Sequence, residues 1–365
     1  MTHLDRIVQE TLTESDQLLL RLSLSDHPSQ RRLDAFLDGW ELDTAPMREA
    51  VLLSYLLKMH PELHCPESIR PRLNGLLSYC RFQYLQLVGQ FGTYCHALEA
   101  EGIRFLVMKG GAMKALRPDF PRWMGDIDLL VPEEDFRKAA QIAARAGFTL
   151  FHSVHSIDLK KDGRNVLDVH QFVMMHTGKE RLANPGFFAR ATPMRVFSVQ
   201  AMMPSREDLL FMTLINLGRN LAGGASKDSI LYSFFDVQFL LEPQAGRTFD
   251  WQIVRDVAKL TGSATLLVIA AQFLNAIVPG LIPEKELPEV SDTELEKKWI
   301  WTRYWKEILH PERDRLGEFN IKKAIQEKTR PIPYITGRLH YAFIKRQQHW
   351  TSLCARRLQR AENAH

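Results

Sequence analysis

The run Asp126-Ile-Asp-Leu-Leu-Val131 places two acidic residues inside an otherwise apolar segment. Upstream, the apolar run 103–108 ends in Lys109-Gly-Gly111, and downstream a second apolar run carries Asp168. Short apolar runs bounded by glycine or proline are typical of buried strands. A strand, a glycine turn, paired carboxylates and a third carboxylate, in this order, predict a site that holds a divalent metal ion against a nucleoside triphosphate.

The composition is that of a globular chain of two or three domains. Its 365 residues are 45% apolar and 25% charged, so a sizeable core is expected. The net charge of +4 does not by itself require a nucleic acid partner. The first residues lack the pattern of a secretory signal, and the most apolar segment, 266–278, is too short to span a bilayer. The four cysteines show no Cys-x-x-Cys spacing, which indicates neither a zinc site nor a disulfide framework. We expect a cytoplasmic protein without a membrane segment.

Hydrophobic periodicity divides the chain into three regions. Residues 1–100 show helical spacing, with the longest helix over about 73–98. Residues 101–203 alternate short β-prone runs with helical ones, and helical spacing returns over 204–365. The predicted strands are 103–108, 127–131, 148–151, 156–160 and 165–172, and the predicted helices between them are 112–116 and 133–146. The predicted fold class is α+β, a small mixed β-sheet core flanked by N-terminal and C-terminal helical regions.

Asp126 and Asp128 are predicted to ligate metal. Side chains alternate along a strand, so both carboxylates point to one face with Cα atoms about 6.6 Å apart. Carboxylates this close raise each other's pKa unless a cation neutralises them. Mg²⁺ binds through a few carboxylates plus substrate phosphates, and Mn²⁺ is the alternative ion. Asp168 lies in a run that could pair beside this strand, and a third carboxylate would let the site hold two ions about 4 Å apart.

The Lys109-Gly110-Gly111 segment is predicted to bind the phosphates. Glycine lets the backbone approach a phosphate closely, and free N–H groups at the start of the following helix attract an anion. Lys109 and Arg122 add positive charge, and the guanidinium can make a bidentate contact. A lone Asp-x-Asp is more often a solvated strand edge, and a lone Gly-Gly is usually a simple turn. The prediction rests on their combination in this order.

These segments resemble a known family. Residues 106–116 and 121–132 are similar to the bacterial nucleotidyltransferase family of the DNA polymerase β superfamily, the group labelled uncharacterised nucleotidyltransferases. Its members show a Leu-Lys-Gly turn, an Arg-x-x-x-Asp-x-Asp-Leu-Leu-Val strand and an acidic-x-His strand. Lys109-Gly110, Arg122 with the Asp-x-Asp pair, and Asp168 with His170 match these three elements, over about seventy residues. Members usually carry serine or glycine after the first glycine; Gly111 fits but offers no hydroxyl.

The resemblance implies an activity and roles for these residues. The reaction would move a nucleoside monophosphate from a triphosphate to an acceptor and release pyrophosphate. Asp126 and Asp128 would ligate both metals, and Asp168 would ligate the catalytic metal and assist deprotonation of the acceptor hydroxyl. His170 shares a strand face with Asp168, so it would contact the acceptor or a phosphate. Lys109, Gly110, Gly111, Arg122 and His170 are therefore the predicted nucleotide-binding residues.

Two other functions remain open, and so does the acceptor. A metal-dependent glycosyltransferase also uses Asp-x-Asp, although it would need a longer Rossmann-like region before the motif. A catalytically idle relative that binds RNA or protein is the alternative outside enzymes. RNA, a protein, a small molecule or a saccharide would all supply a hydroxyl. From residue 318 onward ten Lys or Arg interleave with aromatics, which fits either an RNA-facing surface or a solvated helix that packs its aromatics inward.

Overall fold

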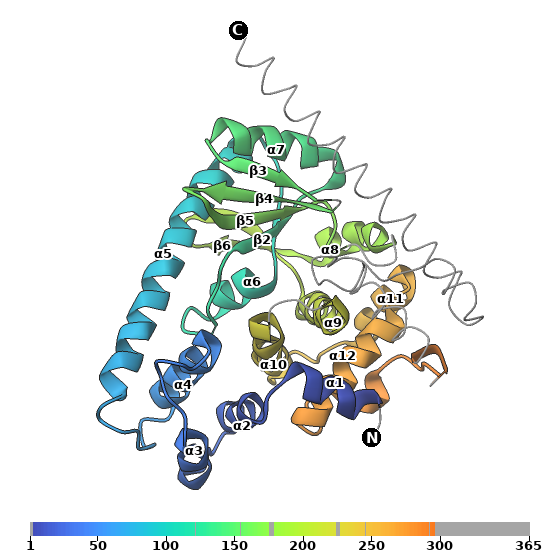
Figure 1. Ribbon diagram of the computed structural model, residues 1–365. Helices are drawn as coiled ribbons and strands as arrows, with labels where there is room; N and C mark the ends of the chain where they lie inside the picture. Colours follow the sequence, from blue (N-terminus) through green and yellow to red (C-terminus); the bar gives the residue numbers. More distant parts are fainter. Residues whose placement is uncertain are drawn as a thin grey trace, which may run out of the picture.

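The protein is described here from a computed structural model. It describes residues 3–295 apart from 121, 154, 175–178, 224–226, 245 and 292. A seven-stranded mixed sheet lies against helices that come from both ends of the described chain (Figure 1). The predicted α+β class, with a mixed sheet between two helical regions of the sequence, is confirmed.

The sheet has the strand order β3-β4-β5-β2-β1-β7-β6. The strands are β1 (Leu106–Val107), β2 (Ile127–Leu130), β3 (Thr149–His152), β4 (Ser156–Lys161), β5 (Arg164–His170), β6 (Thr192–Val196) and β7 (Val199–Met203). β2 pairs in parallel with β5, and β1 pairs in parallel with β7. The other neighbouring pairs are antiparallel. The parallel β2–β5 pair at the centre positions the site.

Two features of the sheet differ from the sequence prediction. β1 is confined to two residues of the predicted run 103–108. The β6–β7 hairpin was not predicted, and its connection contains Phe197 at φ 54°, a left-handed conformation that glycine or asparagine usually adopts in such turns. The usual turn signal is therefore missing from the sequence.

The first helices of the described chain lead into one long helix. They are α1 (His3–Thr11), α2 (Glu14–Ser23), α3 (Gln30–Leu37), α4 (Met47–Met59) and α5 (Arg70–Ala100). α5 confirms the long helix expected over 73–98, and it runs along one side of the sheet (Figure 1). With α7 (Phe136–Arg145) it covers one sheet face, and the Tyr94 hydroxyl donates to the Ala139 carbonyl at 3.0 Å between the two helices. Buried residues such as Leu159 and Leu167 belong to this covered face.

α6 (Lys109–Leu116) follows β1 directly. The helix was expected to begin at residue 112, but it begins at Lys109, so the two glycines lie in its first turn. Glycine is a poor helix former, and close packing explains its presence. A Cβ on Gly111 would lie 3.0 Å from Val107 Cγ1 and 2.9 Å from Ile127 Cγ2.

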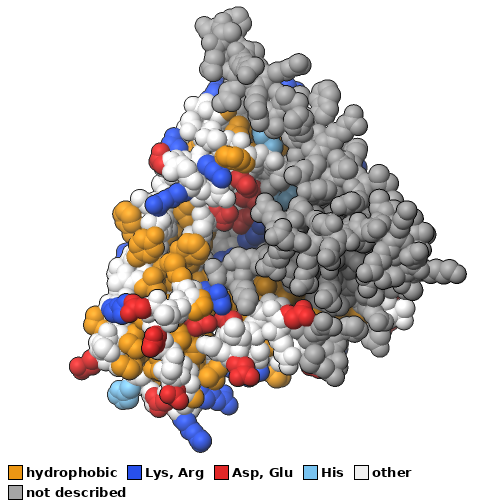
Figure 2. Space-filling view, viewed as in Figure 1, with side chains coloured by type: hydrophobic (Ala, Val, Ile, Leu, Met, Phe, Trp, Pro, Cys, Tyr) orange, Lys and Arg blue, Asp and Glu red, His pale blue; other side chains and the backbone are white. Residues whose placement is uncertain are grey.

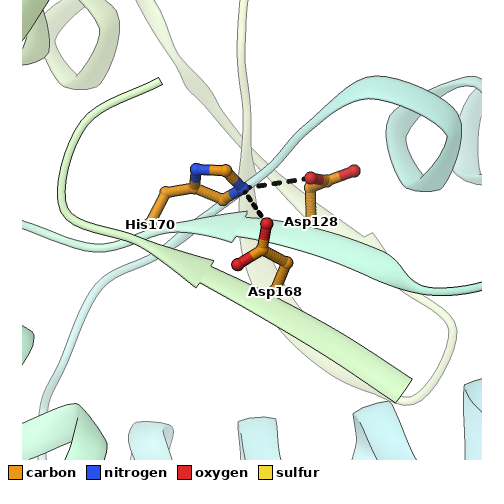
Figure 3. A group of neighbouring side chains, drawn as sticks. All are labelled: Asp128, Asp168 and His170. Carbon is orange, nitrogen blue, oxygen red and sulfur yellow. Dashed lines mark hydrogen bonds and ion pairs between the residues drawn. The ribbon is translucent and has the colours of Figure 1, made fainter. Parts of the chain in front are cut away.

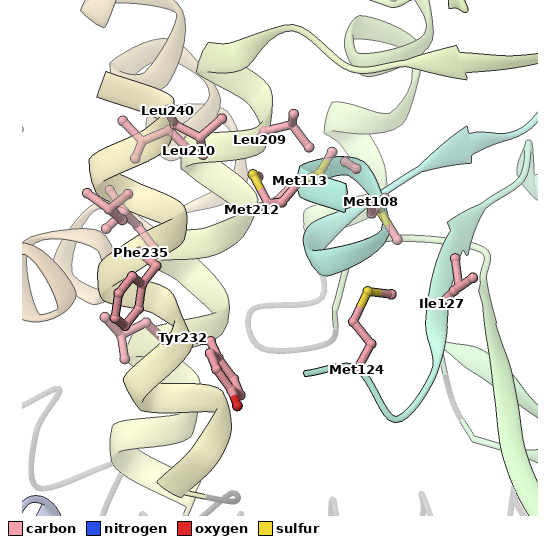
Figure 4. Close-up of a cluster of buried hydrophobic side chains, with 14 of the residues drawn as sticks. Met108, Met113, Met124, Ile127, Leu209, Leu210, Met212, Tyr232, Phe235 and Leu240 are labelled. Atoms are coloured by element: carbon pink, nitrogen blue, oxygen red, sulfur yellow. The ribbon is translucent and has the colours of Figure 1, made fainter. Parts of the chain in front are cut away.

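The helices after the sheet pack against α6. The elements from the sheet onward are η1 (Glu133–Asp135), η2 (Glu180–Ala183), α8 (Asn184–Arg190), α9 (Arg206–Gly223), α10 (Lys227–Leu241), α11 (Trp251–Thr261), α12 (Ala264–Ile277) and η3 (Glu284–Glu286). Apolar side chains near α6 and the start of β2 meet those of α9 and α10 (Figure 4). The labelled members are Met108, Met113, Met124, Ile127, Leu209, Leu210, Met212, Tyr232, Phe235 and Leu240. This shared core joins the later helices to the elements of the site.

The N-terminal helices also contact the later ones. Arg21 Nε donates to the Ile277 carbonyl at 3.1 Å, and Gln238 Nε2 donates to the Leu24 carbonyl at 3.0 Å. The boundaries proposed at residues 100 and 203 remain a prediction. The helices expected around 293–307 and 335–361, including the basic region, fall outside the described residues except for 293–295. Within the described part, none of the helices combines the length and apolar character that crossing a bilayer would require.

Candidate active site

The parallel pairing of β2 with β5 brings two of the predicted carboxylates together. Asp128 and Asp168 are direct register partners, so their side chains stand on the same face of the sheet. His170, two residues after Asp168, shares that face, as the sequence prediction required. This is the face opposite the one that carries Leu167. Figure 3 shows the three side chains converging on one point.

His170 bridges the two carboxylates. Its Nε2 lies 3.0 Å from Asp128 Oδ1 and 2.9 Å from Asp168 Oδ2. The residue is 1% exposed, and its Nδ1 has no hydrogen-bond partner among the described atoms. Burial lowers the pKa of His170, but Asp168 and Asp128 outweigh it and leave the pKa above the usual value. The ring therefore acts as a donor between two negative groups.

Asp128, Asp168 and His170 could hold a metal ion. One ligand atom from each lies within 4.8 Å of the other two. Asp168 Oδ1 is buried without a hydrogen-bond partner in the described part of the chain, so one hard oxygen donor is left to a ligand. Burial raises the pKa of Asp168, but His170 and Lys109 outweigh it, so the pKa falls below the usual value and the carboxylate is ionised. This donor set fits a divalent cation.

Asp126 comes immediately before β2. It does not belong to the group of three residues whose ligand atoms lie within 4.8 Å of one another. Burial, followed by the charge of Asp128, raises the pKa of Asp126 to about 7. A buried carboxylate beside other carboxylates is stabilised by a nearby cation, so this aspartate is also a candidate ligand.

Lys109 supplies the positive charge nearest to the carboxylates. Its Nζ lies 2.5 Å from Asp128 Oδ1, and both side chains are largely buried. The residue has φ 49°, a left-handed conformation that is uncommon for a side chain of this size and typical of functional sites. Burial lowers the pKa of Lys109, but Asp128 and Asp168 outweigh it, so the ammonium stays charged.

Arg122 lies beside the site but is held by a residue far along the chain. Its Nη1 forms an ion pair with Asp236 of α10, and Asp236 is almost fully buried. Gly110 makes room for this arginine, since a Cβ there would lie 2.4 Å from Arg122 Nε. Burial raises the pKa of Asp236, and Arg122 opposes the rise. Sequence reasoning missed Asp236, because its role depends on a contact across 114 residues.

Two further charged residues near the carboxylates were not predicted. Asp158 in β4 is the register partner of Asp168. Arg219 in α9 lies within electrostatic range of Asp168, and burial lowers its pKa despite that carboxylate. The strand pattern alone could have indicated Asp158, because this residue alternates with the apolar residues Ile157 and Leu159 and so faces the opposite side of the strand. No local signal marks Arg219.

The predicted residues thus differ in how directly they contact the centre of the site. Asp128, Asp168, His170 and Lys109 are in direct contact, and Asp126 precedes them. Gly110 and Gly111 serve close packing, and Arg122 reaches the site from its ion pair with Asp236. Figure 2 shows acidic and basic side chains gathered around a hollow near the middle of one face of the molecule.

A comparison with protein families identifies the family to which the chain belongs. The model of a family described as uncharacterised nucleotidyltransferase matches residues 48–279. The chain belongs to this nucleotidyltransferase family. The match includes the whole sheet, the charged cluster and the helices α9 to α12, and it extends well beyond the seventy residues that carry the sequence resemblance. No curated protein matches the chain. Membership supports nucleotidyl transfer as the general activity.

Proposed function

We propose that this nucleotidyltransferase is an active, Mg²⁺-dependent enzyme of the DNA polymerase β-like superfamily. It would move a nucleoside monophosphate from a nucleoside triphosphate to a hydroxyl acceptor and release pyrophosphate. The observation that carries the proposal is the register pairing of Asp128 with Asp168 on parallel strands, beside the Lys109 ammonium. A site of this kind needs carboxylates for metal and a cation for phosphate within a few ångströms of each other.

Asp126, Asp128 and Asp168 would hold the metal ions. All three offer oxygen, which Mg²⁺ prefers, and Mn²⁺ would be accepted by the same donors. Bound Mg²⁺ would supply charge neutralisation at the transferring phosphoryl group and lower the pKa of the acceptor hydroxyl. Asp168 would accept the proton of that hydroxyl, because its burial is outweighed by His170 and it remains ionised. His170 would keep the carboxylates of Asp128 and Asp168 oriented.

The phosphates would bind at the start of α6. Lys109 and Gly110 lie in its first turn, where free backbone N–H groups and the helix dipole favour an anion. Lys109 would shift its ammonium from Asp128 toward a phosphate oxygen. Arg122 has five N–H donors, so the ion pair with Asp236 leaves others for a phosphate.

The order of elements before Asp126 argues against a glycosyltransferase. In the described residues α5 and the helices before it precede β1, so no Rossmann-like run of alternating strands and helices comes before Asp126. The basic region from residue 318 onward, which was considered as an RNA-facing surface, lies outside the described residues.

The double substitution Asp126→Asn with Asp128→Asn tests the proposal. Asparagine keeps the size of each side chain but removes the charge that metal requires, so the protein should fold and its pyrophosphate release should fall by more than about 100-fold. Pyrophosphate release is measured with each triphosphate, Mg²⁺ and host extract, and circular dichroism reports folding. Glu134→Asn, an exposed change near α7, is the control. Triphosphate consumption at the parent rate by the double variant would refute the assignment.

A further inference from the structure

A row of side chains extends from the carboxylates to the edge of the sheet. Asp128 pairs with Asp168, Asp168 with Asp158, and Asp158 with Phe151, on β2, β5, β4 and β3 in turn. Register partners project to the same side of a sheet, so all four stand on the face that carries the site. Neighbouring strands are about 4.8 Å apart, which places Phe151 about 10 Å from Asp168.

The outer half of this row has free binding groups. Phe151 is 47% exposed, although Lys160 Nζ lies over its ring at 4.1 Å from the centroid. Asp158 is half-buried and accepts no hydrogen bond or ion pair from any described residue, and burial followed by the charge of Asp168 raises its pKa. A half-buried carboxylate without a partner costs free energy, and a ligand that donates hydrogen bonds would offset that cost.

The two substrates would lie on opposite sides of Asp128. The sheet order β5-β2-β1 puts Lys109, which follows β1, on one side and Asp168 on the other. If the proposed function holds, the triphosphate occupies the β1 side with Lys109 and α6. The face of β5, β4 and β3 then remains for the acceptor, and the row defines what that acceptor touches.

We propose that this face is the acceptor site and that the acceptor is an uncharged, sugar-like polyol. Asp158 would accept hydrogen bonds from its hydroxyls, and Phe151 would pack against the C–H face of a sugar ring, since those hydrogens suit the negative face of an aromatic ring. The span of about 10 Å from Asp168 to Phe151 accommodates about two such rings.

Charge disfavours a nucleic acid acceptor at this face. A phosphodiester placed between Asp168 and Phe151 would meet the Asp158 carboxylate, and like charges at close range repel. Arg219 and Lys109 lie toward the Asp168 end of the row. At its outer end the ammonium of Lys160 is near Asp158, and it already lies over the Phe151 ring. A neutral polyol avoids this repulsion and still satisfies Asp158.

Ligand-observed saturation-transfer NMR on the full chain tests the proposal. The probes are maltose, an RNA dinucleotide and a serine tripeptide, each at millimolar concentration, with and without a non-hydrolysable triphosphate and Mg²⁺. We expect transfer to the ring protons of maltose alone. Phe151→Ala and Asp158→Ala should each weaken maltose binding by about ten-fold, the loss of about one good contact. Phe151 is largely exposed, so Phe151→Ala should keep the parent melting temperature. Asp158 accepts no hydrogen bond from a described residue, so Asp158→Ala should keep or slightly raise it.

Matched controls separate this site from general surface effects. Phe82→Ala removes a ring that is 57% exposed on α5, and Glu134→Ala removes an exposed carboxylate. Neither should change maltose binding. Absence of maltose binding, equal binding to Phe151→Ala, or preference for the dinucleotide or the tripeptide would each overturn the proposal. Failure of the proposed function shows differently, as the absence of any rise in melting temperature when triphosphate and Mg²⁺ are added to the parent protein.

Discussion

Lys109 is the residue at which the two halves of the site meet. Its ammonium contacts Asp128, and its left-handed backbone ends β1 and begins α6. The same residue therefore neutralises a carboxylate of the proposed metal site and opens the helix whose N–H groups are proposed to bind a phosphate. The next residue, Gly110, allows this geometry only because it has no side chain to displace Arg122.

Gly110→Ala should damage the site directly. The added Cβ would lie 2.4 Å from Arg122 Nε and 3.0 Å from its Cζ, so the arginine must move. We expect a loss of about 1–3 kcal/mol in the free energy of unfolding, as for other overpacked positions, together with a higher KM for the triphosphate. Urea unfolding and steady-state kinetics provide the measurements.

The control for this change is Gly89→Ala in α5. Nothing lies within 4 Å of a Cβ at Gly89, and alanine favours a helix by about 1 kcal/mol over glycine. It should therefore stabilise the protein and leave the KM unchanged. If Gly110→Ala behaved like Gly89→Ala in both measurements, the close approach of Arg122 would have no part in the site.

At the level of elements, the pair Arg122–Asp236 joins α10 to the loop before β2. Asp236→Asn should leave the Arg122 guanidinium largely buried without its counter-charge, at a cost of about 3 kcal/mol in the free energy of unfolding. Replacing both residues with apolar ones, Arg122→Met with Asp236→Leu, should restore most of the stability, because an apolar pair of similar volume replaces a buried ion pair at little cost.

The same double variant distinguishes support from function. We expect its thermal stability to approach that of the parent, whereas its pyrophosphate release should stay at least about ten-fold lower if Arg122 contacts a phosphate. Thermal unfolding and a pyrophosphate assay on the parent, Asp236→Asn and the double variant give both quantities. Full activity in the double variant would show that Arg122 only supports the fold.

The elements differ in how far the sequence predicts them. β2 and β5 were predicted with their acidic residues on one face of the sheet, because the alternation of apolar and acidic residues along a strand is a local signal. α6 was predicted to begin too late, since glycines disfavour a helix and only packing against Val107 and Ile127 explains them. Asp236 and Arg219 could not be found, because the contacts that give them a role join segments far apart in the chain.

In the molecule as a whole, helices from both ends of the described chain pack against the elements that carry the site. Lys114 of α6 lies where three of these helices meet. Its ammonium is 5.7 Å from the Tyr55 ring centroid of α4 and 5.4 Å from that of Tyr84 in α5. Such contacts stabilise a cation only in part, and the remaining desolvation cost falls on the stability of the whole chain.

That cost makes stability depend on pH in a predictable direction. Burial lowers the pKa of Lys114 to about 8, whereas the unfolded chain has the usual value near 10.5. Between these values the unfolded chain holds a proton that the folded chain has released, so this lysine makes stability rise with pH from about 8 to 10.5. Below pH 8 Lys114 is charged in the folded protein as well, so the whole desolvation cost of the buried ammonium lowers the free energy of unfolding. Lys114→Met should therefore raise the free energy of unfolding by about 2 kcal/mol at pH 7, after allowance for partial solvation.

Urea titrations of Lys114→Met and the parent at several pH values measure this effect. The advantage of the variant should shrink steadily above pH 8 and vanish near pH 10.5, because the parent then buries a neutral amine. Lys259→Met, an exposed change in α11, should show no such trend. A constant advantage across this range would mean that methionine improves packing alone. No advantage at pH 7 would mean that the rings of Tyr55 and Tyr84 fully compensate the buried charge.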